Sequence, residues 1–268
     1  MKLAPRSTIR LVLFALPLSL SLAGCETVHG DSYSKSSQWE TPDWNAQLFY
    51  SQNELNEIEF DNGLREVVGE RLNDVERKRA GVRVTAGTKT LRAYVQLFAE
   101  ELDEGNGSAL GSGATVAIDD LYGIGGGIEG ASSVSELAPD VQLVLPFQAG
   151  FNFVIGDGKF TEQTGGSLLA TGFEETELAY IEAELSGGVG VNYYGFRSSI
   201  GLYLSSFKGS TNEDIDAGGD AEEFAFKATN TGLFLDFRYQ NEATPLHGGL
   251  RATAGDVTGI EAFFGFSF

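Results

Sequence analysis

The segment 141–155 reads VQLVLPFQAGFNFVI and alternates strictly between two kinds of position. All its odd-numbered residues are apolar, whereas its even-numbered residues include Gln142, Gln148, Gly150 and Asn152. A repeat of two residues is typical of a β-strand, in which successive side chains point to opposite faces. The segment therefore predicts a strand with one wholly apolar face and one partly polar face.

The same repeat returns along most of the chain. It predicts eight strands, centred on residues 91–97, 122–128, 141–155, 179–193, 200–204, 233–237, 250–254 and 260–268. The segment 81–87 is also extended, but its phase differs from that of Leu91, so it is either a bulged extension of the first strand or a separate edge strand. A composition with 35 Gly, 19 Phe, 9 Tyr and only 6 Pro fits an all-β chain.

The polar faces of these strands carry charged residues in mid-strand together with many glycines. The charged residues are Arg92, Glu129, Glu182, Glu184, Asp236, Arg238, Arg251 and Glu261. Paired charges and small residues are expected inside a transmembrane β-barrel, whose large apolar residues face lipid. Most predicted strands are long enough for a tilted membrane crossing of about 9–11 residues. The pattern predicts a closed antiparallel up-and-down barrel whose charged lumen residues pair with one another.

On these alternating segments, residues 90–268 resemble the small eight-stranded outer-membrane barrels, the class of the OmpA membrane domain and OmpX. The resemblance implies that Phe264, Phe266 and Phe268 form a C-terminal signal for the barrel-assembly machinery. It also implies outer-membrane lipid as a partner and a last strand that pairs with the first. A soluble periplasmic barrel that binds a small apolar ligand, as lipocalins do, remains the alternative.

Residues 1–25 have the features of an export signal, with basic residues followed by an apolar stretch. The residues Leu22-Ala23-Gly24-Cys25 resemble the lipobox of bacterial lipoproteins, which implies cleavage before Cys25 and its acylation. In that family Glu26, unlike Asp, implies delivery to the outer membrane, with the anchored N-terminus on the periplasmic side. We further expect a polar tether at 26–60, a short amphipathic helix at 61–80 and the barrel at 81–268.

Charge and chemistry exclude several other functions. The formal net charge of −20 disfavours nucleic acid, whose phosphates require a basic surface. His29 and His247 are the two histidines, and no catalytic set is evident around His247, so we expect neither an enzyme nor a cofactor. A lipid-modifying outer-membrane enzyme is the least favoured reading. The acidic segment 212–223 is expected to be a solvated outer loop that binds divalent cations weakly at most.

Overall fold

The computed structural model describes residues 43–56, 58–62, 70–72, 75–88, 90–104, 115–161, 174–214, 222–240 and 245–268. These residues belong to one compact unit. The predicted export signal, the lipobox with Cys25, and most of the predicted tether lie outside the described residues, as does most of the acidic segment. Within the described ranges no helix is long and apolar enough to cross a membrane.

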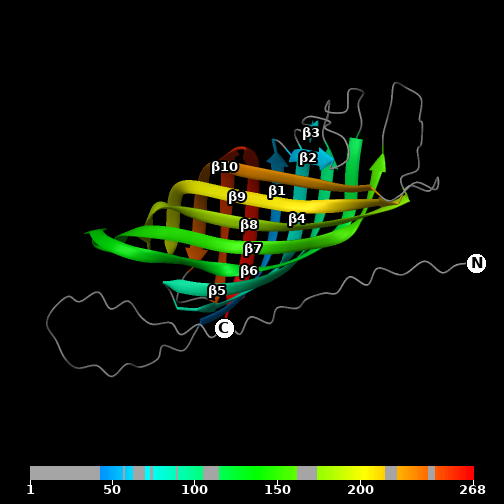
Figure 1. Cartoon of the computed structure of the whole chain (residues 1–268). Coiled ribbons are helices and arrows are strands. Elements are labelled where there is room, and N and C mark those ends of the chain that lie inside the picture. Colours follow the sequence, from blue (N-terminus) through cyan, green and yellow to red (C-terminus); the bar gives the residue numbers. More distant parts are fainter. Residues whose placement is uncertain are drawn as a thin grey trace, which may run out of the picture. The chain divides into compact units, whose positions relative to one another are not determined.

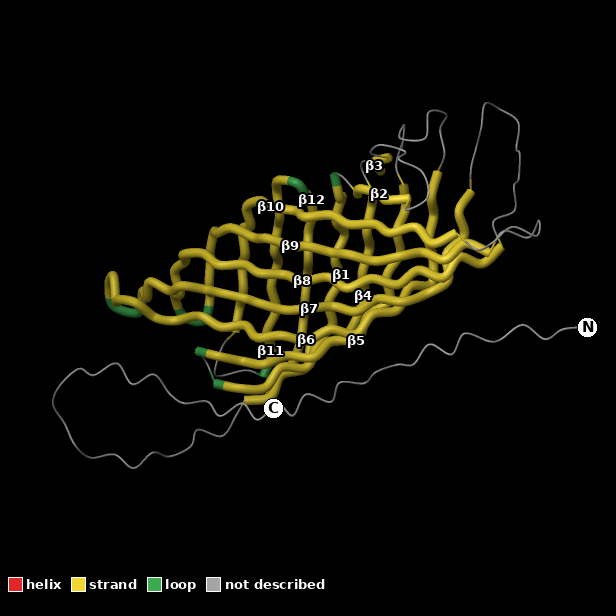
Figure 2. Tube along the Cα trace, in the orientation of Figure 1, coloured by secondary structure: helices red, strands yellow, loops and turns green. Residues whose placement is uncertain are grey.

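Twelve strands form one antiparallel sheet (Figures 1 and 2). They are β1 (Asp43–Leu55), β2 (Ile58–Asn62), β3 (Glu70–Leu72), β4 (Val75–Gly87), β5 (Leu91–Glu104), β6 (Thr115–Ala138), β7 (Val141–Thr161), β8 (Glu174–Tyr193), β9 (Phe196–Asp214), β10 (Glu222–Gln240), β11 (Leu246–Gly255) and β12 (Val257–Ser267). Ten of them, all except β2 and β3, close into a barrel because β10 pairs with β11.

The register of this barrel is sheared. A circuit through hydrogen-bonded partners runs from Gln240 to His247, Gly265, Gln47, Arg83, Gln96, Gly125, Asn152, Glu182 and Phe207, and returns to β10 at Ala228. The start and end of the circuit, positions 240 and 228, are twelve residues apart. A ten-stranded barrel with this shear has strands tilted by about 40° to its axis. The sheet is therefore fully closed and has no long open seam.

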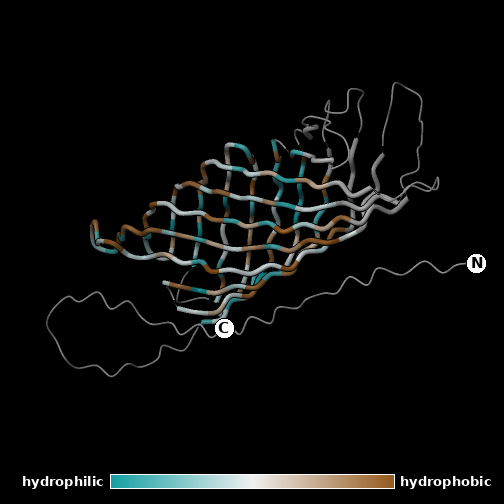
Figure 3. The backbone as a smooth tube through the Cα atoms, viewed as in Figure 1, coloured by the Kyte–Doolittle hydropathy of each residue, from teal (hydrophilic) through white to brown (hydrophobic). Residues whose placement is uncertain are grey.

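The two faces of the sheet differ in polarity, as Figure 3 shows by the alternation of colours along the strands. Large apolar side chains on the outward face are exposed, with Leu48 at 64% and Leu202 at 66%. Polar side chains on the inward face are buried, with Asn45 at 2% and Glu182 at 0%. The predicted alternation is thus confirmed: the outward face is apolar, and the inward face carries the buried polar and charged side chains together with buried apolar ones.

All eight predicted strands are present, as β5 to β12, but the predicted strand count of eight is wrong. Two further barrel strands precede them, β1 and β4. The predicted tether at 26–60 contains β1, and the predicted helix at 61–80 is contradicted because its described residues belong to β2, β3 and β4. The segment 81–87 is a continuous part of β4. The ten strands distinguish this barrel from the eight-stranded class that the sequence resembles.

The helix was predicted because charged residues hide the strand repeat in β4. Arg77 and Arg79 are buried on the inward face, while Glu76 and Lys78 lie on the outward face beyond its apolar part. Where both faces carry charge, hydropathy no longer alternates. Because the apolar residues before Arg77 recur at helical spacing, the sequence there predicts a helix.

The last strand closes the barrel against β1 and not against the strand beginning at Leu91. β12 pairs with β1 from Asn45↔Ser267 to Leu55↔Val257. The ladder ends with two backbone hydrogen bonds, from Phe268 N to Trp44 O (2.8 Å) and from Trp44 N to Phe268 O (3.3 Å). The N-terminal end of β1 and the C-terminus of the chain therefore lie together at what we call the terminal end of the barrel.

At the opposite end, β11 and β12 are short and leave part of β10 uncovered. β2 pairs with this part, from Phe224↔Asn62 to Lys227↔Glu59. Hydrogen bonds from two neighbouring segments, one after β1 and one in β10, hold the tight turn between β11 and β12. Asn56 N donates to Asp256 O (3.0 Å), and Thr231 N donates to the Asp256 carboxylate (2.8 Å). The paired strands β2 and β3 and this turn are thus part of the opposite end.

At the terminal end, the β6–β7 hairpin extends past its neighbour. β5 begins at Leu91, opposite Gly130, so the rest of β6, up to Ala138, pairs with β7 alone. The hairpin turn is tied to the β8–β9 turn, since the Tyr194 hydroxyl donates to Asp140 at 2.7 Å. The neighbouring carboxylate raises the pKa of this exposed tyrosine, because loss of its proton would bring two negative charges together.

Candidate functional site: the barrel interior

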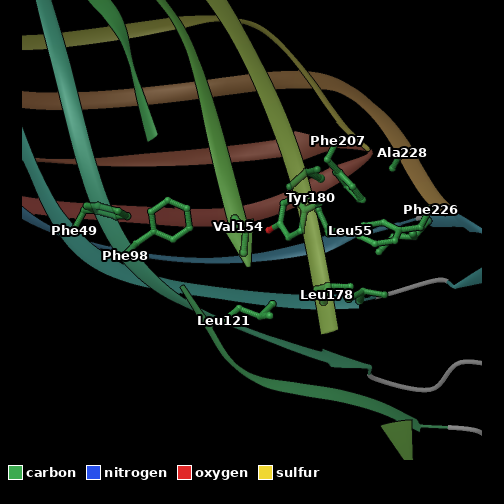
Figure 4. Close-up of a cluster of buried hydrophobic side chains, with 13 residues drawn as sticks. Phe49, Leu55, Phe98, Leu121, Val154, Leu178, Tyr180, Phe207, Phe226 and Ala228 are labelled. Atoms are coloured by element: carbon green, nitrogen blue, oxygen red, sulfur yellow. The ribbon is translucent and has the colours of Figure 1, made fainter. Parts of the chain in front are cut away.

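The interior near the opposite end is filled by apolar side chains. Thirteen buried residues form one cluster, ten of which are labelled in Figure 4. The cluster combines aromatic rings such as Phe207 and Phe226, whose centroids are 6.1 Å apart, with aliphatic residues such as Leu55 and Val154. Because these residues come from most of the strands and from β2, they block the interior at this level.

A buried ionic network lies next to this cluster. The Glu182 carboxylate accepts from Arg77 Nη1 and pairs with Arg79 Nη2, both at 2.7 Å. Glu100 pairs with Arg79 and also accepts from the Tyr180 hydroxyl. Burying charge is costly unless each charged group finds partners, and here two carboxylates meet two guanidinium groups.

The network continues toward the terminal end through amides. Asn152 Nδ2 donates to Glu182 (3.1 Å), Gln96 Nε2 donates to Asn152 (2.7 Å), and Arg83 Nε donates to Gln96 (2.8 Å). Arg83 also lies 3.7 Å from Glu261. These contacts run along the wall from β8 through β7, β5 and β4 to β12, so they link five strands within one continuous part of the wall.

A second charged cluster lies at the terminal end. Arg238 Nε donates to both oxygens of Asp236 (2.9 and 3.1 Å), and Arg238 Nη1 donates to Glu129 (3.2 Å). Arg92 Nη1 donates across the lumen to Gln240 (3.2 Å). Both carboxylates of this cluster are thus bound by the same arginine.

The glycines of segment 123–127, which lack any phosphate-loop residues after them, make room for side chains in the lumen. A Cβ at Gly123 would lie 2.1 Å from the Phe98 ring, and one at Gly125 would lie 2.0 Å from Asn152 Oδ1. A Cβ at Gly127 would lie 2.8 Å from the Tyr94 hydroxyl. The inward-facing glycines therefore permit the dense filling of the interior.

The eight charged residues predicted for the lumen have the following positions. Arg92, Glu129, Asp236 and Arg238 belong to the terminal cluster, and Glu182 belongs to the buried network. Glu184 lies 3.7 Å from Arg79, and Glu261 lies 3.7 Å from Arg83. Arg251 donates to Gln148 (3.0 Å) and stacks on the Phe234 ring at 4.4 Å.

The sequence reading missed Arg77, Arg79 and Arg83 as interior residues. The available signal was their common parity, since all three occupy odd positions that continue to Thr85 on one face of the strand. The predicted helix concealed that parity. As a consequence, the partners of Glu182 and Glu184 could not be identified from the sequence.

His247 is buried on the inward face of β11. Its Nδ1 lies 3.5 Å from the Ser267 hydroxyl, a neighbour that the sequence reading did not anticipate. The Ser267 hydroxyl donates instead to Asn45 Oδ1 (2.5 Å). No carboxylate among the described residues pairs with His247, so a base and its orienting acid are not assembled there. The described residues also contain no group of three or more His, Cys, Asp or Glu side chains suited to holding a metal ion.

Comparison with known proteins supplies little beyond the architecture. No family model matches the chain, and no curated protein matches its sequence. Among solved structures, the outer membrane protease OmpT of Escherichia coli is 10% identical, with 87% of this chain and 96% of that chain covered and a TM-score of 0.34. The beta domain of the Bordetella autotransporter BrkA is 11% identical, with 85% and 100% covered and a TM-score of 0.39.

The Pseudomonas putida toluene transporter TodX is 9% identical, with 83% of this chain and 67% of that chain covered and a TM-score of 0.26. At these identities and TM-scores, none of the three structures carries an argument about the role of this chain.

Proposed function

We propose that this chain is an integral outer-membrane β-barrel protein, lipid-anchored at Cys25, with a structural or surface-interaction role. The observation that carries the proposal is the belt of exposed apolar side chains on the outward face. Val95 and Leu97 on β5, for example, are 58% and 60% exposed. Exposed apolar patches of this extent are rare on soluble monomers and fit a barrel that faces lipid.

The belt also has the height that a bilayer requires. On β7 the outward apolar residues extend over eleven positions, from Leu145 to Ile155, and on β12 and the residue after it they extend over nine, from Ile260 to Phe268, whereas the run on β1 is shorter. Tilted membrane strands need about 9–11 residues to cross the hydrocarbon layer. The exposed rings of Trp44 and Tyr50 are placed as in the aromatic girdles of membrane barrels.

The filled interior supports a structural or surface role over solute transport. The apolar cluster and the cross-lumen hydrogen bonds occupy the space through which a solute would pass. Specificity for a surface partner then belongs to the connections at the opposite end, which face outward if the terminal end is periplasmic.

Under this proposal the terminal end of the barrel faces the periplasm. An acylated Cys25 would place the lipid anchor on the same side of the membrane as the start of β1. Several acyl chains at about 0.8 kcal/mol per buried CH₂ would give a second, independent attachment to the membrane.

The soluble lipocalin-like alternative requires the reverse polarity. A ligand-binding barrel in water turns its large apolar residues inward and leaves a cavity for the ligand. Here the inward face carries the buried ions, and the outward face carries residues such as Ile260 and Phe264 at 59% and 52% exposure.

Membrane extraction of the Cys25→Ala variant separates the two readings. We expect the unlipidated barrel to stay in membranes through urea and carbonate washes and to migrate on detergent gels at different positions before and after heating. A soluble domain tethered only by lipid would be released by urea. Release of the variant in urea would contradict the integral barrel.

We further propose that the protein is not an enzyme. No carboxylate among the described residues pairs with His247, so the acid that would orient a catalytic histidine is not found beside it, which supports this proposal. The His247→Ala variant should leave the composition of outer-membrane lipid A unchanged by mass spectrometry. A change in lipid A that also appears with Ser267→Ala would instead establish a catalytic pair.

A further inference from the structure

The terminal end of the lumen contains more positive charge than its own carboxylates neutralise. The arginines there are Arg92, Arg197 and Arg238, and the acidic residues are Glu129 and Asp236. Both acids are bound by Arg238. Among the described residues, no carboxylate forms an ion pair with Arg92 or Arg197.

Hydrogen bonding at these two arginines is incomplete as well. The Nε atoms of Arg92 and Arg197 are buried and have no hydrogen-bond partner within the part of the chain that the structure describes. Arg92 uses Nη1 to reach Gln240, whose strand also carries Arg238, the Cα partner of Arg197. The charges of Arg92 and Arg197 are near enough to repel each other, and the Asp236 and Glu129 carboxylates, although bound by Arg238, also attract Arg197.

The other lumen arginines have an acidic or an aromatic partner, although the Nε atom of Arg77 is also buried without a hydrogen-bond partner among the described residues. Arg77 and Arg79 share Glu100 and Glu182, and Arg83 has Glu261. Arg251, which also lacks an acid, is compensated by Gln148 and by the face of Phe234. Arg92 and Arg197 are half-buried, so water or an anion can reach their guanidinium groups, and no ion pair among the described residues neutralises their charge.

We propose that Arg92 and Arg197 form a binding site for a phosphate group at the terminal mouth of the barrel. Guanidinium groups bind phosphate oxygens through paired, charge-assisted hydrogen bonds. Three arginines and two carboxylates leave a local excess of one positive charge, which a phosphate group would offset; a phosphate monoester carries about −1.5 to −2 at neutral pH. The net charge of the chain is −20, so this local excess of positive charge would select anions at one end only.

The phosphate can come from a soluble compound in the periplasm or from the headgroup of an inner-leaflet phospholipid. This inference rests on the proposed function in one respect only: the proposed orientation of the barrel determines the compartment to which the site opens. The arginines and their missing partners are properties of the folded barrel, so the site can be tested on purified protein in detergent.

The first arm of the test is calorimetric titration of the full chain in a phosphate-free maltoside detergent with inorganic phosphate at low salt. We expect one site per barrel and a loss of affinity of about tenfold or more in both Arg92→Gln and Arg197→Gln. Arg251→Gln is the matched control, because it removes the same charge from the same lumen, and it should change the affinity by less than about twofold. A gel-mobility assay before each titration confirms that every variant is folded.

The second arm uses the same variants refolded into phosphatidylglycerol vesicles, with ³¹P NMR to count immobilised lipid phosphorus. Immobilised phosphorus that disappears in Arg197→Gln but remains in Arg251→Gln, without binding of inorganic phosphate, identifies the headgroup as the source. Absence of a signal in both arms overturns the proposal. An equal effect of Arg251→Gln also overturns it, because binding would then follow total charge. Failure of the extraction experiment above would leave the detergent result intact.

Discussion

At the scale of single residues, Glu182 connects more of the barrel than any position that the sequence reading singled out. It is fully buried and bonded to Arg77, Arg79 and Asn152. Replacing it with Gln would take the paired carboxylate from Arg77, while Arg79 would keep Glu100 and Glu184. We expect Glu182→Gln to lower the free energy of unfolding by about 3–5 kcal/mol, measured by urea titration of the protein in vesicles.

The control for this variant is Glu101→Gln, which removes a charge from an exposed position on the outward face. Its cost should stay below about 0.5 kcal/mol. Equal losses in the two variants would show that net charge, and not the buried network, determines stability.

Glycines on the two faces should respond in opposite directions to the same substitution. Gly123→Ala places a methyl group against the Phe98 ring and should destabilise the barrel by about 1–3 kcal/mol. At Gly187 the nearest atom to an added Cβ is Pro146 O at 3.9 Å, so Gly187→Ala should be neutral or stabilising by up to about 1 kcal/mol. Unfolding midpoints in urea compare the two directly, and a larger loss at Gly187 would contradict the crowding of the lumen.

At single residues, the sequence predicts whether a side chain points inward or outward, but it does not predict the partners of that side chain. Parity along a strand correctly separated inward from outward side chains, because the backbone alone sets it. Pairing depends on register around the closed sheet, and a sequence repeat contains no register. The sequence therefore places Glu182 in the lumen, whereas its bonds to Arg77 and Arg79 are evident only from the structure.

At the scale of elements, β1 is indispensable because it pairs on both sides, with β12 and with β4. Deletion of residues 43–55 should abolish the heat-modifiable band on detergent gels, since two strand edges would lose their partners. Deletion of residues 27–38, which contribute to no described pairing, is the matched control and should preserve that band. A folded, heat-modifiable product of the first deletion would contradict the observed closure.

The end of β12 tests the C-terminal assembly signal. Removal of Phe268 takes away two backbone hydrogen bonds to Trp44, a small loss for the finished barrel. We therefore expect insertion in cells to fall several-fold while refolding in detergent changes little, and Phe268→Tyr should behave as the wild type. Equal losses in cells and in detergent would assign Phe268 to stability alone, and normal insertion would argue against the signal.

The elements show where a hydropathy repeat fails as a predictor. Strands β5 to β12 were predicted because their outward faces remain apolar for most of their length. β4 was missed because charges occupy both of its faces near Arg77. β1 was missed because its inward face is occupied by Asn45, Gln47 and Ser51 and its outward apolar run is brief, so the segment reads as polar overall.

At the scale of the whole molecule, the filled lumen predicts an electrically closed barrel. Cross-lumen contacts such as Arg238–Glu129 and Arg251–Gln148 obstruct the lumen toward the terminal end, and the apolar cluster of Figure 4 fills it near the opposite end. Folded protein added to a planar bilayer should give no stepwise conductance at neutral pH. Stable single-channel steps from protein that passes the gel-mobility assay would contradict this prediction.

The strand at residues 43–55 also fixes the parity of the barrel. Without it nine strands would remain, and the two free edges, β4 and β12, both run toward the terminal end, so they could meet only as parallel neighbours. With it the count is ten, and both ends of the barrel domain emerge in one compartment, joined by the bonds between Trp44 and Phe268. A reporter fused to either end would therefore be exported to the same side of the membrane, and a pair of reporters, one on each end, would be held close enough to interact.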